Sequence, residues 1–131
     1  RFIIVPRRLY AHQLLATLTD MHTAKKYDRM VMYMEACESG SMFNGLLPSD
    51  LRILAVTAAS PYESSFACYY DNVLGTFLGD CFSNHWLEHE DQTPGSVEAS
   101  ESLAYQVSEV KSKTNSSHVC VYGEVSLLSH R

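Results

Sequence analysis

The segment from Met30 to Ser41, M-V-M-Y-M-E-A-C-E-S-G-S, constrains the fold more than any other part of the chain. Its apolar run from Met30 to Glu35 ends in a single carboxylate, a pattern typical of a strand that helices cover on both faces. Cys37 follows the strand, and Ser39, Gly40 and Ser41 give a small, pliable turn whose backbone N–H groups are free to point at a ligand. Open α/β sheets place their sites at this end of a strand, so the segment predicts a site at Cys37.

Helical and strand patterns alternate along the rest of the chain, which at 131 residues is long enough for one domain with a real core. Apolar spacing predicts helices over 11–26, 76–90 and 96–113, a helical turn over 42–47, and strands over 2–5, 30–35, 51–58 and 118–122. A helical connection between the strands 30–35 and 51–58 implies that they are parallel. The loop from Ser60 to Ser65 then lies at the same sheet edge as Cys37 and forms a wall of the site.

Composition excludes several classes of protein. The net charge of −5 and the scattered Lys and Arg residues argue against a nucleic-acid partner. No apolar run is long enough to span a bilayer, and the N-terminal segment is too short in apolar residues for a signal peptide. A chain that opens on Arg1 and proceeds directly into a strand is expected to be cut from something longer. Its four cysteines are too widely spaced for a disulfide-stapled secreted domain, so we expect free thiols.

The residues around Cys37 leave its role open. A reactive thiol needs a cation, an imidazole or a helix N-terminus nearby, whereas Glu35 and Glu38 disfavour the thiolate. Taken alone, this pattern favours a buried, inert cysteine over a nucleophile. Glu35, Glu63 and Asp80 fall on the presumed site edge, where each is ordinarily a solvated carboxylate. If they converged with a serine hydroxyl, they would favour a ligand with N–H donors, a cation or a primary amide.

A zinc site is the other constellation that we weighed. Cys81, His85 and His89 recur at helical spacing, but three ligands along one helix cannot close a tetrahedron, and Glu88 does not fit the H-E-x-x-H pattern. We therefore expect no metal and no cofactor. His118, at a strand start, is conceivable as a base but more typical of a solvated surface histidine. Asn115 begins the acceptor sequence N-S-S, and its use in glycosylation would place the protein in the secretory pathway.

Four motifs occur in the same order as in the legumain family of asparaginyl endopeptidases, which the chain resembles over nearly its whole length: E-A-C-E-S-G-S, T-A-A-S-P-Y-E-S-S-F-A-C-Y-Y-D, F-L-G-D and K-T-N-S-S-H-V. The resemblance implies an α/β, caspase-like three-layer fold with a parallel-dominated sheet, whose first strands are absent from this chain. Residues 1–131 would then be one partial peptidase catalytic domain. The resemblance further implies that Cys37 is the nucleophile, that its N–H is part of the oxyanion hole, and that Glu35, Ser64 and Asp80 line the specificity pocket.

The implied function is asparagine-specific proteolysis in a lysosome or vacuole, with protein or peptide substrates and a C-terminal prodomain in the parent protein. Pocket carboxylates accept hydrogen bonds from an asparagine amide and repel an ionised aspartate, so cleavage after Asp should need acid. The family's catalytic His-Gly motif falls before the counterpart of Phe2, so we expect the isolated chain to be inactive. The alternative is a catalytically inactive, legumain-like binding or regulatory protein. Cys81 and Cys120 depart from the family pattern and have no assigned role.

Overall fold

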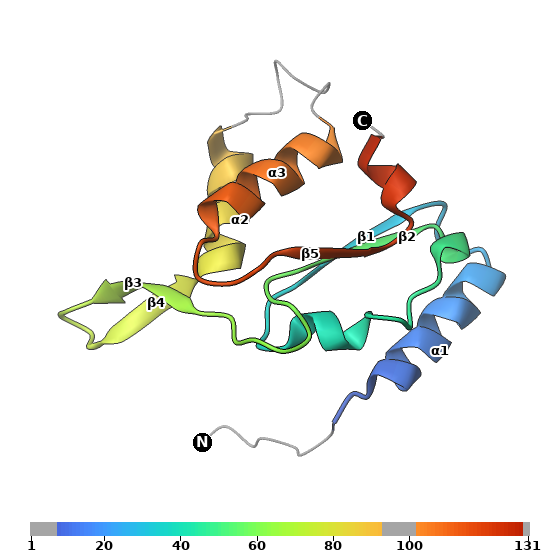
Figure 1. Ribbon diagram of the computed structural model, residues 1–131, viewed down its shortest axis with the longest axis horizontal. Coiled ribbons are helices and arrows are strands. Elements are labelled where there is room, and N and C mark those ends of the chain that lie inside the picture. The colour runs from blue at the N-terminus through green and yellow to red at the C-terminus, as the bar shows by residue number, and fades with distance from the viewer. Residues whose placement is uncertain (1–7, 93–101, 130–131) are drawn as a thin grey trace.

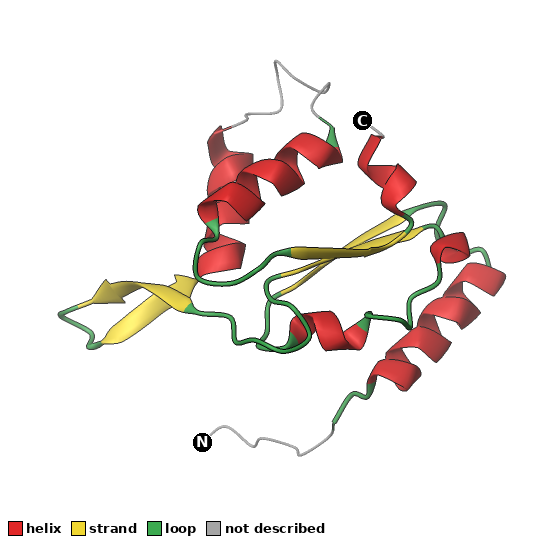
Figure 2. Ribbon diagram, in the orientation of Figure 1, coloured by secondary structure: helices red, strands yellow, loops and turns green. Residues whose placement is uncertain are grey.

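The computed structural model describes residues 8–92 and 102–129, in which helices surround a small central sheet (Figure 1). The helices are α1 (Ala11–Thr23), α2 (Cys81–Gln92) and α3 (Leu103–Lys113), and short 3-10 turns cover Ser39–Met42, Ser49–Leu51 and Val125–Ser129. The strands are β1 (Met30–Met34), β2 (Ile53–Thr57), β3 (Ala67–Asp71), β4 (Thr76–Asp80) and β5 (Cys120–Gly123). Figure 2 shows that β3 and β4 form a hairpin that projects away from the body of the molecule.

The central sheet has the strand order β1-β2-β5. β1 runs parallel to β2, with Met30 opposite Ile53 and Met34 opposite Thr57, which confirms the predicted parallel pair. β5 pairs with the other side of β2 in the antiparallel direction. Both carboxyl ends of the parallel pair therefore lie at one edge of the sheet, where Cys37 follows β1 and the Ser60–Ser65 loop follows β2.

The fully buried strand of the sheet is β2, whereas the sequence predicted full burial for the segment 30–35, which forms β1. Every residue of β2 is buried, whereas every residue of β1 is only half-buried, so the prediction that β1 is a buried strand is wrong. The reason is position: within the described residues β1 is an edge strand, and β2 lies between two partners. An apolar run alone does not distinguish a central strand from an edge strand. The predicted cover of helices on both faces is confirmed, because Tyr33 packs on the side of Phe82 and Met32 packs on the side of Leu18.

Alternate residues of β2 divide the core between two faces. Leu54 and Val56 pack with Phe82 of α2 and Val110 of α3 on one face. Ile53 points to the opposite face, where it packs with a buried residue of α1, Leu18. This period of two is the side-chain alternation of a strand, so helices cover both faces of the sheet, as Figure 1 shows.

The segment 76–80 differs from its prediction, since it is strand β4 and the helix begins only at Cys81. The Asp71 carboxylate accepts hydrogen bonds from the N–H groups of Val73 (2.7 Å) and Leu74 (2.8 Å), and Gly75 adopts a φ of +65°. This turn folds the chain back, so that Thr76 pairs with Asp71 and Asp80 pairs with Ala67. A carboxylate that bonds the N–H groups of its own turn favours a hairpin over a continuing helix.

The other boundaries differ by smaller amounts. The first helix ends at Thr23 rather than at residue 26, the helical turn precedes 42–47, and the final strand begins two residues later than predicted. The helix predicted over 96–113 is described from Leu103, where Ser102 caps it by accepting from the N–H of Tyr105 at 3.4 Å. The predicted strand 2–5 and the first part of that helix lie outside the described residues.

Candidate active site

The Cys37 side chain lies at the carboxyl end of β1 and is exposed. Its thiol donates to the main-chain carbonyl of Ser65, with 3.7 Å between Sγ and O, and Sγ lies 3.9 Å from the Ser65 hydroxyl. The predicted contact between the Cys37 loop and the Ser60–Ser65 loop is therefore confirmed. The prediction from the residues around it, a buried cysteine, is wrong, because the segment from Ala36 to Glu38 that follows β1 is exposed.

Hydrogen bonds to the end of β2 hold the turn after Cys37. Ser39 is 1% exposed, and its hydroxyl accepts from the N–H of Ala59 (3.1 Å). The N–H of Gly40 donates to the Ala59 carbonyl (3.1 Å), and the N–H of Glu38 donates to the Glu63 carbonyl (2.8 Å). The expected pliable turn with free N–H groups is thus wrong for residues 38–41, whose N–H groups all have backbone partners. Within the described part of the chain, the N–H of Cys37 itself has no such partner.

Gly40 allows the turn to lie against β5. A Cβ atom at this position would lie 2.5 Å from the Tyr122 hydroxyl and 3.0 Å from Cδ of Pro61. Burial, followed by contact with the Cys120 thiol, raises the pKa of Tyr122 to about 12, so this hydroxyl stays protonated at physiological pH. The turn therefore depends on a glycine that the sequence analysis treated only as flexible.

Glu63 connects three segments around Cys37, a role that the sequence analysis missed. Its carboxylate accepts from the N–H of Ser60 (2.7 Å) and lies 2.8 Å from Nδ1 of His118, while its carbonyl accepts from Glu38. The N–H of His118 donates to the same carboxylate (3.0 Å). The hydrogen bond with the His118 side chain, followed by that with Ser60, lowers the pKa of Glu63 to about 2. The spacing S-x-x-E from Ser60 to Glu63 is a capping-box pattern, and it could have indicated the hydrogen bond from the Ser60 N–H to the Glu63 carboxylate.

Glu35 joins the end of β1 to the first turn of α2. Its Oε2 accepts from the Ser83 N–H (2.8 Å) and the Ser83 hydroxyl (3.0 Å). A carboxylate is stabilised at the positive end of a helix, where N–H groups lack intrahelical partners. The other oxygen, Oε1, is buried and has no hydrogen-bond partner in the described residues. An orphaned buried acceptor is costly, so this atom calls for an N–H or O–H donor.

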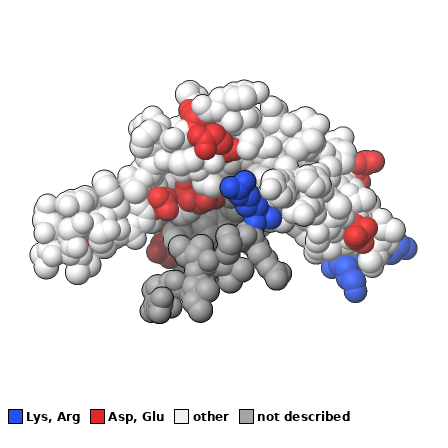
Figure 3. All heavy atoms as spheres, turned by 90° about the horizontal axis from the view of Figure 1, so that it is seen from below, with Lys and Arg blue, Asp and Glu red and all other residues white. Residues whose placement is uncertain are grey.

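Ser64 and Asp80 flank this region without forming part of the contacts above. Ser64 is exposed on the loop that touches Cys37, and Asp80 is exposed at the end of β4, directly before α2. Figure 3 shows acidic side chains beside the base of the projecting hairpin. The topology therefore brings Asp80 and Glu35 to the same end of α2, while their roles in binding remain predictions.

The residues weighed for zinc lie on α2 and serve other contacts. Nδ1 of His85 lies 3.0 Å from the Thr114 hydroxyl, and His89 is buried and packs against the ring of Tyr105. Across residues 8–92 and 102–129, no three His, Cys, Asp or Glu side chains are grouped to hold a metal ion. Asn115 is exposed beyond α3. In the same part of the chain, no helix has the length and apolar character needed to cross a membrane.

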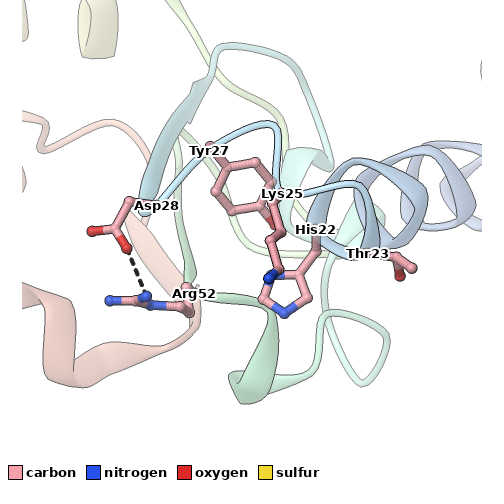
Figure 4. A pocket seen from close by; sticks show the side chains of 6 residues that line it. All are labelled: His22, Thr23, Lys25, Tyr27, Asp28 and Arg52. Atoms are coloured by element: carbon pink, nitrogen blue, oxygen red, sulfur yellow. Dashed lines mark hydrogen bonds and ion pairs between the residues drawn. The ribbon is translucent and has the colours of Figure 1, made fainter.

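A separate hollow lies at the opposite edge of the sheet (Figure 4). Six residues line it: His22, Thr23, Lys25, Tyr27, Asp28 and Arg52. Arg52 forms an ion pair with Asp28 at 2.7 Å, so the positive charge of Arg52 in this hollow is already paired with a carboxylate. Arg52 directly precedes β2 and Asp28 shortly precedes β1, so the hollow is at the amino ends of the strands, away from Cys37.

The exposed Cys37 and the orphaned oxygen of Glu35 therefore lie at the carboxyl end of a parallel strand. Comparison of the whole sequence with known proteins places the chain in a family. The model of the peptidase C13 family matches residues 1–131, and the chain belongs to this family. It is 49% identical to legumain of Mus musculus over 121 residues, which are 91% of this chain and 26% of the relative.

Two further relatives extend this similarity to other organisms. The chain is 48% identical to legumain of Homo sapiens over 117 residues, covering 88% of this chain and 26% of the relative. It is 45% identical to the vacuolar-processing enzyme delta-isozyme of Arabidopsis thaliana over 123 residues, covering 85% of this chain and 26% of that protein. The chain thus spans about a quarter of the length of these relatives.

Proposed function

We propose that this chain is part of the catalytic domain of a cysteine endopeptidase that cleaves after asparagine. The observation that carries the proposal is the pairing of an exposed thiol, Cys37, with a carboxylate two residues earlier whose Oε1 lacks a donor. Membership of a peptidase family and the names of the relatives support this function. The fold of the complete domain would be the caspase-like three-layer arrangement, to which β1, β2 and the helices on both faces contribute.

Cys37 would act as the nucleophile of a two-step reaction. Its sulfur attacks the carbonyl carbon of the scissile peptide, and the amine leaves with a proton. Water then cleaves the thioester and releases the acyl group. The Cys37 N–H would bind the developing oxyanion, since this group has no backbone partner in the described residues. The base would be a histidine that precedes Phe2 in the complete protein, so the isolated chain would be inactive.

Glu35, Ser64 and Asp80 would form the pocket for the asparagine side chain. Ser83 occupies one oxygen of Glu35 and leaves Oε1 to accept from the substrate amide. A neutral carboxamide supplies two N–H donors, whereas an ionised aspartate supplies none and is repelled. Aspartate would therefore be accepted only when acid protonates it, which suits a lysosomal or vacuolar enzyme that travels through the secretory pathway.

The remaining proposals concern the complete protein. Its substrates would be proteins or peptides with an accessible asparagine, and a C-terminal prodomain would accompany the catalytic domain. Asn115 is exposed and is accessible to glycosylation. No cofactor takes part in the thioester mechanism, and nothing in the proposed pocket chemistry requires a metal.

The test is the substitution Cys37→Ser in the full-length protein, with an asparagine-containing peptide as substrate. We expect turnover to fall by roughly a thousandfold or more, because the thiol carries the covalent step. Cys120→Ser is the matched control, since its half-buried thiol donates to the His118 carbonyl (3.3 Å) and contacts the Tyr122 hydroxyl, and a serine hydroxyl can keep both contacts. Undiminished turnover in Cys37→Ser would end the proposal. Peptide binding without cleavage by the unmodified protein would instead favour the catalytically inactive binding protein.

A further inference from the structure

Glu38, the residue directly after Cys37, adopts a backbone conformation that its side chain disfavours. Its φ is +50°, in the left-handed region where residues other than glycine are uncommon. A residue persists there only when surrounding contacts fix it. One such contact is the hydrogen bond from the Glu38 N–H to the Glu63 carbonyl (2.8 Å). Because this N–H lies in one peptide plane with the Cα and carbonyl atoms of Cys37, the bond also orients the main chain of Cys37.

The side chain of Glu63 holds that carbonyl in place, because it fixes the loop from Ser60 to Ser65 at both of its faces. Oε1 of Glu63 accepts from two backbone N–H groups, those of Ser60 (2.7 Å) and His118 (3.0 Å). Oε2 lies 2.8 Å from Nδ1 of His118. The three contacts tie the loop to the segment that leads into β5.

The segment around His118 is itself firmly attached to the sheet. Its neighbours Ser117 and Val119 are both buried, although the His118 side chain is exposed. The Ser117 hydroxyl donates to the carbonyl of Ala58 (2.6 Å), which directly follows β2. The N–H of Ala58 donates in turn to the carbonyl of Met34 (3.0 Å), the last residue of β1. The contacts of Glu63 therefore lead back to the ends of both parallel strands.

We propose that Glu63 is a positioning residue, which fixes the main chain and the thiol of Cys37 by holding the Ser60–Ser65 loop against His118. The Glu63 carbonyl binds the N–H that follows Cys37, and the carbonyl of Ser65 accepts from its thiol at 3.7 Å. One loop thus contacts both sides of the nucleophile. A misplacement of about 1 Å can cost a hundredfold in rate, so this role concerns the chemical step more than substrate binding.

The importance of this positioning for turnover rests on the proposed peptidase function. The positioning itself does not, because it concerns hydrogen bonds that exist without a substrate. Glu63 touches neither the proposed asparagine pocket nor the scissile bond in this scheme. Its effect on the reaction would pass entirely through Glu38 and Ser65 to Cys37.

Glutamine can replace the contacts of Glu63, whereas alanine cannot. In Glu63→Gln the amide oxygen can accept from both backbone N–H groups, and the amide nitrogen can donate to Nδ1 of His118 when that nitrogen carries no proton. Glu63→Ala removes all three side-chain contacts and leaves the loop with its main-chain bond to Glu38. Glu124→Ala is the matched control, since its carboxylate accepts from the Ser126 hydroxyl (2.8 Å) at the opposite end of β5.

The first measurement is residue-resolved amide hydrogen exchange in the full-length protein. In Glu63→Ala we expect the Glu38 amide to exchange roughly tenfold faster or more, while the amides of β2 keep their rates. Glu63→Gln and Glu124→Ala should leave the Glu38 amide close to the unmodified rate. Unchanged exchange at Glu38 in Glu63→Ala would overturn the proposal, whether or not the protein is a peptidase.

The second measurement is steady-state kinetics with an asparagine-containing peptide, expressed per Cys37 thiol that reacts with an alkylating peptide, so that unfolded molecules are not counted. Glu63→Ala should lower kcat roughly tenfold to a hundredfold and change KM by about threefold or less. Glu63→Gln should recover most of kcat, and Glu124→Ala should not change it. A raised KM with unchanged kcat, or no recovery in Glu63→Gln, would overturn the positioning role. Absence of cleavage by the unmodified protein would instead contradict the proposed function, and the exchange at Glu38 would still decide whether Glu63 positions the turn.

Discussion

Glu35 and Ser83 are joined by two hydrogen bonds, from the Ser83 N–H at 2.8 Å and from its hydroxyl at 3.0 Å. These bonds hold the end of β1 against the first turn of α2, although the two residues are 48 positions apart. They also fix which oxygen of Glu35 stays without a partner. The orientation of this carboxylate therefore depends on the beginning of a helix rather than on β1 itself.

Ser83→Ala should loosen that orientation. The substitution removes the hydroxyl bond and keeps the N–H bond, so we expect a loss of about 1 kcal/mol in the free energy of unfolding. Chemical denaturation measures this change. Ser126→Ala is the matched control, because it removes a hydroxyl bond to a glutamate on the exposed surface and should change stability by about 0.5 kcal/mol or less. Equal effects of the two substitutions would show that the bond to Glu35 has no special importance.

Asp80→Ala should separate binding from folding. Asp80 is exposed, so the free energy of unfolding should change by about 0.5 kcal/mol or less. If it accepts from the asparagine amide, kcat/KM for an asparagine peptide should fall by roughly tenfold to a hundredfold, the value of one hydrogen bond to a charged group. The measurement is a comparison of kcat/KM and denaturation in the full-length protein. Losses of activity and stability in parallel would make Asp80 a structural residue.

Gly40→Ala should destabilise the turn after Cys37. The new Cβ would lie 2.5 Å from the Tyr122 hydroxyl, and overpacking of this kind costs about 1–3 kcal/mol. Tyr122→Phe removes the clashing oxygen and should recover part of the loss when the two substitutions are combined. A double-mutant cycle of unfolding free energies measures the recovery. Additive losses in the cycle would mean that Pro61, rather than Tyr122, sets the space available at Gly40.

Stability should depend on pH through Glu63. Its pKa is lowered to about 2 in the folded protein from 4.5, so folding favours the ionised form. The contribution is fully present above pH 4.5 and is lost as the pH falls towards about 2. Glu63→Gln should therefore flatten the unfolding free energy in this window. Denaturation of both proteins across acidic pH tests this, and an unchanged slope in the variant would assign the acid sensitivity to other carboxylates.

The sequence was sufficient for elements whose pattern is set by burial. The spacing of Leu14, Leu15 and Leu18 predicted α1, and the apolar runs predicted β1, β2 and their parallel pairing. The hairpin was missed because its side chains do not alternate between core and solvent. Phe77 and Leu78 are adjacent and both more than half exposed, so periodicity contained no strand signal there.

The candidate site was predicted in outline but not in its supporting contacts. The position of Cys37 beside the Ser60–Ser65 loop followed from the parallel strands. The link from Glu63 to His118 spans 55 positions, and the packing of Gly40 on Tyr122 depends on where β5 lies. Contacts between distant residues have no local sequence signal, so these supports became visible only in three dimensions.

The β3–β4 hairpin gives the molecule two regions of unequal rigidity. A two-stranded ribbon is only marginally stable by itself, and Val73 at its tip is 94% exposed, whereas β2 is buried throughout. Amide hydrogens of the hairpin should therefore exchange with solvent well before those of β2. Cys37 and Glu35 follow a strand anchored to the slow-exchanging β2, while Asp80 belongs to the fast-exchanging ribbon. A ligand that bridges Glu35 and Asp80 would lose conformational entropy by ordering the ribbon, and slower exchange in β4 would report its binding.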